Sequence, residues 1–265
     1  IFTKNGKLIA NAPHMPVHLG SMHKSVESII ENNKNKITKG DVFALNAPYN
    51  GGTHLPDITV ISPFFYKDEL SFFVASRGHH ADVGGTAPGS MTPLAKSIEE
   101  EGVLFDNLKI VDNGDFKEDK IVSILKNHKY PARNVFQNIS DIKAQIAANE
   151  KGSNLLINSI HQYGKIKFLK YVEFVQKNAE ERVINSLKKL KNVECKLITD
   201  NNAIIKVKLR IDKEKQSIIV DFTGTSPQQT NNFNAPKPVT IAAVLYCFRI
   251  LVDKNIPMNA GCLKP

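Results

Sequence analysis

Two β-type segments separated by a short polar turn constrain the fold of this chain more than any other part of its sequence. Residues 58–65 and 70–76 are rich in Ile, Val, Phe and Thr, side chains that favour strands. Residues 67–69 (Lys-Asp-Glu) between them have the polar character of a turn. The pattern predicts a β-hairpin whose tip lies near Lys67.

The open end of this hairpin brings two polar segments together. They are residues 51–57 (GGTHLPD), which enter the first strand, and residues 77–85 (RGHHADVGG), which leave the second. Antiparallel pairing about Lys67 puts Asp57 opposite residue 77 or 78, within one or two residues. The same pairing puts His54 opposite His80. Two imidazoles and a carboxylate are therefore expected to converge there.

This convergence indicates a metal site. A His-x-x-Asp sequence alone is more typical of a turn cap before a strand. With His79 or His80 added from the facing strand, His54 and Asp57 form a set of two histidines and one carboxylate. Such a set suits a divalent transition metal and leaves coordination positions open. Asp82 can orient one of the imidazoles through its second nitrogen, or can be an ordinary turn cap.

Composition limits the class of protein. The chain has 265 residues and a hydrophobic content of 42%, enough to bury a substantial core. No apolar run reaches the roughly 20 residues that span a bilayer. The net charge is +9, but 30 of the 35 basic residues are lysines and they are scattered among acids. This distribution favours a solvated surface over a nucleic-acid interface.

Cysteine usage and the chain start bear on where the protein resides. The three cysteines are far apart and include no Cys-x-x-Cys pair, which favours a reducing cytoplasm. The sequence starts at Ile1 with no charged-then-apolar leader, so we expect neither a signal peptide nor a natural translation start. The chain is therefore expected to be a fragment of a longer protein.

The periodicity of apolar residues predicts an α+β fold with antiparallel hairpins, a strand meander and a long helical middle. Helices are expected at residues 21–31, 115–127, 138–149, 165–190 and 239–252, and further strands at 42–45, 194–199, 203–210 and 216–221. We divide the chain into a metal-site region (1–130), a helical region (131–192) and a meander with a C-terminal helix (193–265).

A polar stripe accompanies the apolar face of the helix expected at residues 138–149. Asn138, Asp141 and Gln145 lie along it at helical spacing and are candidates for lining a substrate pocket. The plainer interpretation makes Asn138 the N-cap and Asp141 a first-turn acid. The sequence alone leaves both open.

Several motifs together resemble one known family. They are the hairpin segments, PGSM (88–91), YPARN (130–134), QN (137–138), DIKAQ (141–145), DFTGTSPQ (221–228), NAP (234–236), IPMN (256–259) and GCLKP (261–265). In this order they resemble the hydantoinase B/oxoprolinase family, and most closely its ATP-dependent 5-oxoprolinase branch. The resemblance covers most of the chain and implies that the chain is part of a larger domain.

The resemblance also implies roles for the hairpin residues. In the related acetone carboxylase the corresponding motifs hold a metal through a His, an Asp and a second His. This pattern falls on His54, Asp57 and His79, and it favours His79 over His80 as the ligand. His80 and Asp82 are then left for proton transfer or for contacts with the substrate.

The implied reaction is the ATP-dependent opening of the lactam of 5-oxo-L-proline to L-glutamate. A hydantoinase A-like half, fused or separate, would bind ATP and activate the amide. The chain itself carries no phosphate-binding loop and no dinucleotide fingerprint. The chain would contribute a divalent metal ion, and the ligand set does not distinguish Zn, Mn and Fe. The enzyme is expected to be oligomeric and cytoplasmic. Neither a nucleic acid nor a membrane is expected as a partner. The alternatives are an α-type subunit of an ATP-dependent ketone carboxylase and a non-catalytic partner-binding module.

Overall fold

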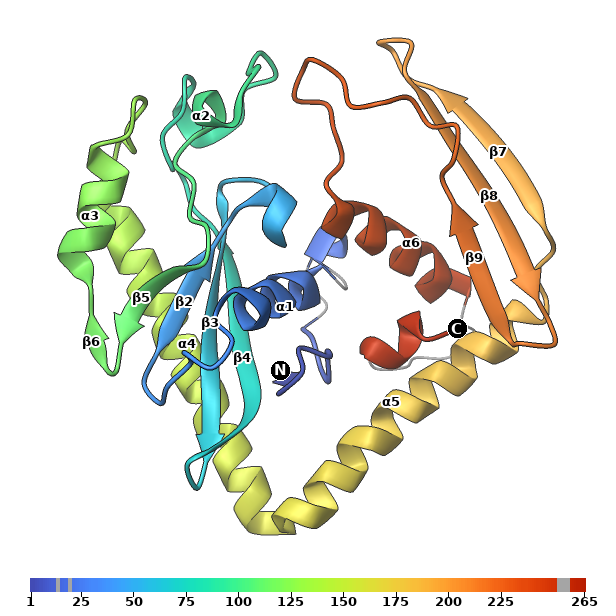
Figure 1. Ribbon diagram of the computed structural model, residues 1–265, viewed down its shortest axis with the longest axis horizontal. Helices are drawn as coiled ribbons and strands as arrows, with labels where there is room; N and C mark the ends of the chain where they lie inside the picture. Colours follow the sequence, from blue (N-terminus) through green and yellow to red (C-terminus); the bar gives the residue numbers. More distant parts are fainter. Residues whose placement is uncertain (13–14, 19–20, 252–257) are drawn as a thin grey trace.

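Two long helices joined at a sharp corner organise the fold. The computed structural model describes residues 1–12, 15–18, 21–251 and 258–265. Helices α4 (Val135–Tyr163) and α5 (Lys165–Leu187) form the two arms of a V, and each arm carries one lobe on its inner side (Figure 1). Gly164 lies at the corner with φ 79° and ψ 142°, a conformation that ends α4 and favours glycine.

The first lobe contains a six-stranded antiparallel sheet in the order β1-β4-β3-β2-β5-β6. Its strands are β1 (Phe2–Thr3), β2 (Val42–Leu45), β3 (Asp57–Tyr66), β4 (Glu69–His79), β5 (Leu108–Asp112) and β6 (Asp115–Phe116). The predicted hairpin is β3–β4, and its tip consists of Lys67 and Asp68, which both have positive φ. Asp57 pairs directly with His79, within the expected register error.

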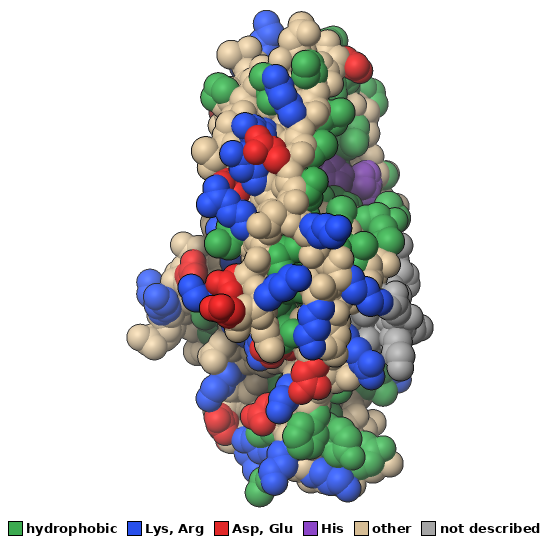
Figure 2. Space-filling model, turned by 90° about the vertical axis from the view of Figure 1, so that its right-hand side faces the viewer, with side chains coloured by type: hydrophobic (Ala, Val, Ile, Leu, Met, Phe, Trp, Pro, Cys, Tyr) green, Lys and Arg blue, Asp and Glu red, His purple; other side chains and the backbone are tan. Residues whose placement is uncertain are grey.

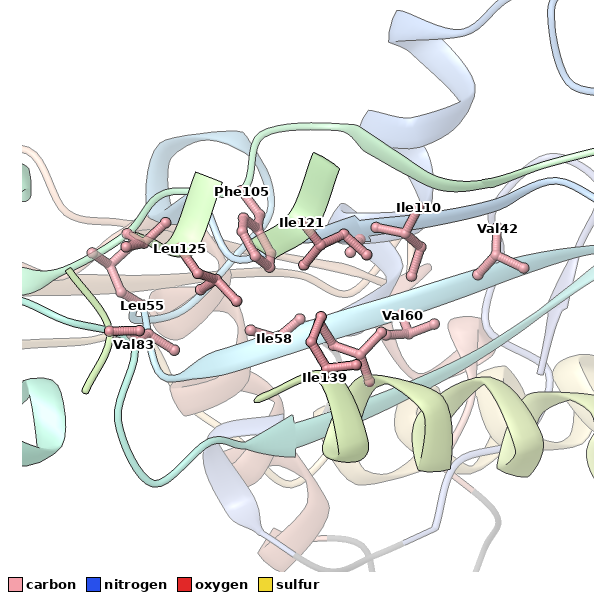
Figure 3. Close-up of a cluster of buried hydrophobic side chains, with 14 of the residues drawn as sticks. Val42, Leu55, Ile58, Val60, Val83, Phe105, Ile110, Ile121, Leu125 and Ile139 are labelled. Atoms are coloured by element: carbon pink, nitrogen blue, oxygen red, sulfur yellow. The ribbon is translucent and has the colours of Figure 1, made fainter. Parts of the chain in front are cut away.

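The two faces of this sheet are covered by different helices. One core contains Phe43, Ile61 and Phe73 packed against α1 (Met22–Asn32). The other lies on the side of α3 (Glu118–Lys126) and α4, and it includes the apolar side chains labelled in Figure 3: Val42, Leu55, Ile58, Val60, Val83, Phe105, Ile110, Ile121, Leu125 and Ile139. Because side chains alternate between the faces of a strand, the neighbouring residues Val60 and Ile61 of β3 belong to opposite cores.

The second lobe is a three-stranded antiparallel meander packed on α5 and α6. Its elements are β7 (Val193–Ile198), β8 (Ile204–Asp212), β9 (Ser217–Asp221), α6 (Lys237–Leu251) and the 3₁₀ turn η4 (Ala260–Leu263). The first lobe also contains four short helical elements: η1 (Pro16–His18), η2 (Pro48–Asn50), η3 (Pro88–Ser90) and α2 (Ile98–Glu101). The lobes meet where η1 contacts α6 and where the backbone of Ala260 donates to the carbonyl of Leu8.

The predicted α+β class is confirmed, with corrections to individual elements. The helix expected at 115–127 starts only at Glu118, because Asp115 and Phe116 form a strand with β5. The helix expected at 138–149 is the middle of the much longer α4. Strands β1 and β5 were not predicted. Val252 at the end of one expected helix, and residues 256–257 of the IPMN motif, lie outside the described residues.

The surface carries charges of both signs. On the face that includes the second lobe, Lys and Arg side chains are spread out and mixed with acids (Figure 2). Lys206 and Lys208, for example, both pair with Glu194. The positive charge therefore forms no single stripe on this face. Each helix in the described part of the chain is too short or too polar to cross a membrane.

Candidate metal centre

The three residues predicted as metal ligands lie together at the open end of the β3–β4 hairpin. The Asp57 side chain is 1% exposed, and its Oδ2 is 2.9 Å from Nδ1 of His54. The rings of His54 and His79 stand with their centroids 5.2 Å apart. His79 reaches the same face as Asp57 because the two residues are direct partners across the hairpin.

A buried asparagine shapes the loop that delivers His54. The Nδ2 of Asn46 donates to the carbonyls of Leu55 (2.8 Å) and Val103 (3.0 Å), and its Oδ1 accepts from the backbone of Phe105 (2.7 Å). A Cβ at Gly52 would stand 2.3 Å from the carbonyl oxygen of Asn46. The close approach requires glycine at this position, which explains the Gly before Thr-His in the motif.

A third histidine, His18 of η1, also faces Asp57. Its Nε2 is 3.6 Å from Asp57 Oδ2, and its Nδ1 is 3.4 Å from Nη1 of Arg77. Sequence reasoning missed His18, because no spacing ties it to the hairpin. The position of Arg77 beside the centre could have been predicted from the sequence. It lies two residues before His79, and residues two apart in a strand share a face.

The environment lowers the pKa of both the central carboxyl group and the third histidine. Burial alone would raise the pKa of Asp57, but hydrogen bonds from His54 and Thr53 and the charges of His54 and His18 lower it below its usual value. Burial lowers the pKa of His18, and the Arg77 charge adds to this while Asp57 opposes it. The centre therefore offers an anionic oxygen next to imidazole nitrogens.

The spacing of these groups suits a divalent metal. Nitrogen and oxygen ligands stand about 2.0–2.2 Å from a zinc-type ion, so two ligands at a right angle are about 3 Å apart. The 2.9 Å separation of Asp57 Oδ2 and His54 Nδ1 matches this value. Two imidazoles bound to one ion have centroids about 4.5–5.3 Å apart, and His54 and His79 lie within that range. As they stand in this structure, however, no three or more His, Cys, Asp or Glu side chains of the described residues are arranged so that they could hold a metal ion. The donor types and the His54–Asp57 spacing suit a metal, and metal binding remains a prediction.

His80 lies on the opposite face of the hairpin, against α4. It is 1% exposed, its Nε2 contacts Gln145 Oε1 (3.1 Å), and its Nδ1 contacts Asn138 Nδ2 (3.2 Å). The amide of Gln145 donates through Nε2 to the carbonyls of Ile58 and Ser76, so its oxygen faces the ring. Nε2 of His80 is therefore the donor and Nδ1 the acceptor. Burial lowers the pKa of His80, and both ring nitrogens of the neutral ring are already hydrogen-bonded.

The polar stripe on α4 mainly contacts the hairpin. Asn138 and Gln145 are buried, whereas Asp141 is partly exposed and accepts from Gln137 Nε2 at 2.7 Å. The interpretation of Asn138 as N-cap is wrong, because Asn134 caps α4 by accepting from the backbone of Gln137. The buried Oδ1 of Asn138 has no hydrogen-bond partner among the described residues. A substrate-binding role for the stripe remains a prediction.

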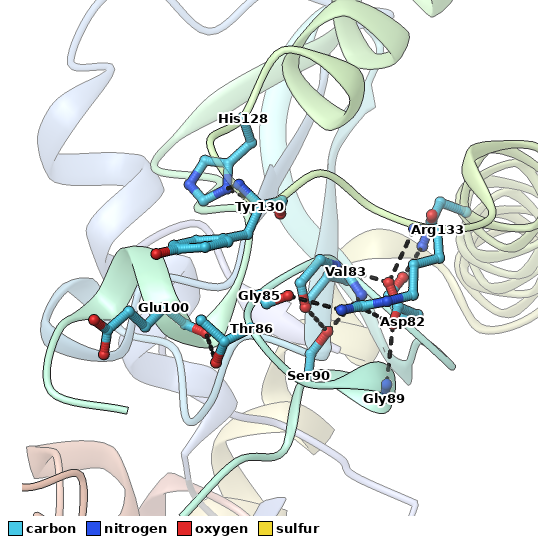
Figure 4. A network of polar contacts seen from close by, with 12 residues as sticks. Asp82, Val83, Gly85, Thr86, Gly89, Ser90, Glu100, His128, Tyr130 and Arg133 are labelled. Carbon is cyan, nitrogen blue, oxygen red and sulfur yellow. Dashed lines mark hydrogen bonds and ion pairs between the residues drawn. The ribbon is translucent and has the colours of Figure 1, made fainter. Parts of the chain in front are cut away.

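Asp82 anchors the loop that follows β4 (Figure 4). Its carboxylate accepts from the backbones of Gly84 (2.9 Å), Gly89 (3.0 Å) and Arg133 (3.1 Å) and from Nη1 of Arg133 (2.7 Å). Its carbonyl accepts from Asn138 Nδ2. Burial alone would raise the pKa of Asp82, but these hydrogen bonds lower it below its usual value. The geometry matches the turn-cap interpretation, and the catalytic role stays a prediction.

Substituting asparagine for Asp82 is expected to lower the free energy of unfolding by about 1–3 kcal/mol, because charge-assisted hydrogen bonds to the loop are lost. A carboxyl whose pKa is lowered in the folded state contributes stability above its unfolded pKa of about 3.9 and loses it as the pH falls further. Denaturant unfolding at pH 7 and pH 3 should show a smaller pH dependence in Asp82→Asn than in the wild type. An unchanged pH dependence would contradict this account.

A groove of about 900 Å³ lies beside the loop that carries His54. Tyr49 of η2 lines it from the first lobe, and Ile205, Phe222 and Phe233 line it from the second. Gln228 Nε2 reaches the Tyr49 hydroxyl at 3.5 Å. The groove thus joins the second lobe to the loop that holds one of the candidate ligands.

Comparison with known proteins finds relatives that match the chain over its full length. A family model described as hydantoinase B/oxoprolinase matches residues 1–265. The chain is 45% identical over 289 residues to 5-oxoprolinase 1 of Arabidopsis thaliana, covering all of this chain and 23% of that protein. It is 44% identical over 280 residues to 5-oxoprolinase of Saccharomyces cerevisiae, covering all of this chain and 22% of that protein. The crystal structure of the ATP-dependent caprolactamase from Pseudomonas jessenii shares the fold, with a TM-score of 0.86 and 24% identity over 99% of this chain and 46% of that chain. The chain thus spans less than a quarter of the length of these two 5-oxoprolinases.

Proposed function

The chain belongs to the hydantoinase B/oxoprolinase family, and from this premise we propose that it forms the hydrolytic half of an ATP-dependent enzyme that opens the lactam of 5-oxo-L-proline to L-glutamate. The observation that carries the proposal is the convergence of His54, Asp57 and His79 at the open end of the hairpin. The similarity to proteins named 5-oxoprolinase supports the choice of a cyclic amide as the substrate.

His54, Asp57 and His79 would hold a divalent ion, for which their donor set allows Zn, Mn or Fe. When bound, such an ion polarises an amide oxygen or lowers the pKa of a water molecule. In this structure Thr53 (2.8 Å) and His54 both donate to Asp57 Oδ2, and a bound ion would take the place of the His54 proton. The buried carboxylate thereby fixes the orientation of the His54 ring.

The nucleotide chemistry would take place in a hydantoinase A-like partner half. The chain has no phosphate-binding loop of its own. The two 5-oxoprolinase relatives are more than four times longer than the segment they share with it, which supports a fused partner. A cytoplasmic location is proposed from the three free cysteines. The activated intermediate would pass from the partner half to the His54 centre.

Replacing His54 by alanine in the intact protein is expected to remove ATP-dependent glutamate formation from 5-oxoproline. The loss should exceed the roughly 10–100-fold cost of removing a group that only supports a metal ligand. His161→Ala is the matched control, because His161 lies on Tyr66 at the hairpin tip, at the other end of strand β3 from Asp57. Glutamate is measured with and without bicarbonate.

Three outcomes separate the alternatives. Glutamate formation that needs only water and ATP, and is lost in His54→Ala alone, supports the proposal. A requirement for bicarbonate with a ketone substrate would favour a carboxylase subunit instead. Full activity in His54→Ala would rule out this centre as the site of hydrolysis.

A further inference from the structure

A buried arginine fixes the third histidine of the centre. The guanidinium of Arg77 donates through Nε to Thr59 Oγ1 (2.7 Å), through Nη1 to Ser21 Oγ (3.0 Å) and through Nη2 to Ser25 Oγ (2.8 Å). Ser21 and Ser25 belong to the start of α1 and Thr59 to β3, so three hydroxyls from two elements hold the group. Burial lowers the pKa of Arg77 to about 10, so it is still a cation at neutral pH.

Arg77 also decides which nitrogen of His18 carries the proton. A guanidinium is only a donor, so its contact with His18 Nδ1 (3.4 Å) is a hydrogen bond only if Nδ1 has a free lone pair. The proton of the neutral ring is then on Nε2. This nitrogen points toward Asp57, and the His18 side chain is 21% exposed, so a small molecule in the centre can reach it.

Among the described residues, the Nε2–H of His18 has no acceptor within hydrogen-bond distance. Asp57 Oδ2 already accepts from Thr53 Oγ1 at 2.8 Å and from His54 Nδ1 at 2.9 Å. His18 Nε2 remains 3.6 Å from the same oxygen, beyond the usual length of a hydrogen bond. A ligand oxygen placed between His18 Nε2 and Asp57 could accept this hydrogen at a normal hydrogen-bond distance.

We propose that His18 donates its Nε2–H to an oxygen of the bound cyclic amide and is not a metal ligand. This inference rests on the proposed function, because it takes its substrate from there. A ligand role would require a lone pair on Nε2, hence a proton on Nδ1 that would face the donor of Arg77. The carbonyl of a lactam, which gains negative charge when its carbon is attacked, is the oxygen that such a fixed donor stabilises most.

The test compares His18→Gln with His18→Leu in the intact protein. The terminal amide nitrogen of glutamine can donate from near the position of Nε2, whereas leucine has a similar size and no donor. Both variants are expected to keep the metal content of the wild type. His18→Leu should lower kcat/KM for 5-oxoproline about 100–1000-fold, the usual cost of a donor to a developing oxyanion, and His18→Gln should recover most of the loss. Thermal unfolding confirms that each variant is folded.

The results that overturn the inference are distinct. Loss of metal from His18→Leu, as from His54→Ala, would make His18 a ligand. A wild-type kcat/KM in His18→Leu would show that His18 has no role in the reaction. An equal loss of kcat/KM in His18→Leu and His18→Gln would refute the role of His18 as a donor. A wild-type protein that forms no glutamate from 5-oxoproline would instead overturn the proposed function, and this inference with it.

Discussion

Replacing Asp57 by asparagine is expected to abolish both metal binding and lactam opening. The carboxylate is buried and accepts hydrogen bonds from Thr53 and His54, while His18 Nε2 lies 3.6 Å away. Asparagine has nearly the same shape but no charge, so it loses the anionic ligand while the surrounding loop keeps its packing. We expect kcat/KM to fall on the order of a thousandfold or more, because the activation of water and amide oxygen by the metal is lost.

The matched control for Asp57→Asn is Asp41→Asn. Asp41 is also a buried aspartate beside the same sheet, but it is held by Lys109 (2.9 Å) and by the backbones of Thr38 and Asn113, at the start of β2. This variant should lose stability and keep its metal. Metal content and activity are measured on both proteins. An Asp57→Asn protein that retains its metal and turns over substrate at the wild-type rate would refute the assignment of Asp57.

Replacing His80 by leucine is expected to destabilise the fold more than to change the chemistry. The substitution leaves Gln145 Oε1 and Asn138 Nδ2 without their ring partner in a buried site. Each unsatisfied buried group costs about 1–3 kcal/mol, so the free energy of unfolding should fall by about 2–5 kcal/mol. Denaturant titration of the intact protein measures this loss.

The same variant discriminates between the two roles considered for His80. If the ring only ties β4 to α4, activity per folded molecule should fall far less than in Asp57→Asn. If His80 also transfers a proton, activity per folded molecule should fall about as far as in Asp57→Asn. His161→Leu on the exposed surface of α4 is the control for the stability measurement and should change it by less than about 0.5 kcal/mol.

The hairpin could be predicted from sequence because both strands are long and the turn between them is short and polar. Its register was expected only within one or two residues. The turn residues Lys67 and Asp68, together with a bulge between Phe64 and Phe65, set the final pairing of Asp57 with His79. A shift of one residue would have exchanged His79 and His80 between the two faces. The family resemblance, not the spacing, favoured His79.

The position of His18 beside Arg77 and Asp57 could not be predicted from the sequence. Nearly 40 residues separate His18 from Asp57, and η1 has no period or motif that points toward the hairpin. The polar stripe of α4 illustrates the same limit. Helical spacing identified Asn138 and Gln145 as one face, but it could not show that this face contacts His80 and the backbone of β3.

Elemental analysis of the intact protein, wild type beside His54→Ala, measures whether the centre at the open end of the hairpin holds a metal ion. We expect about one divalent transition-metal ion per chain in the wild type and loss of that ion in the variant, since a site with one ligand fewer binds far more weakly. A wild-type protein that stays free of metal after incubation with Zn²⁺, Mn²⁺ and Fe²⁺, or a His54→Ala protein with an undiminished metal content, would contradict it.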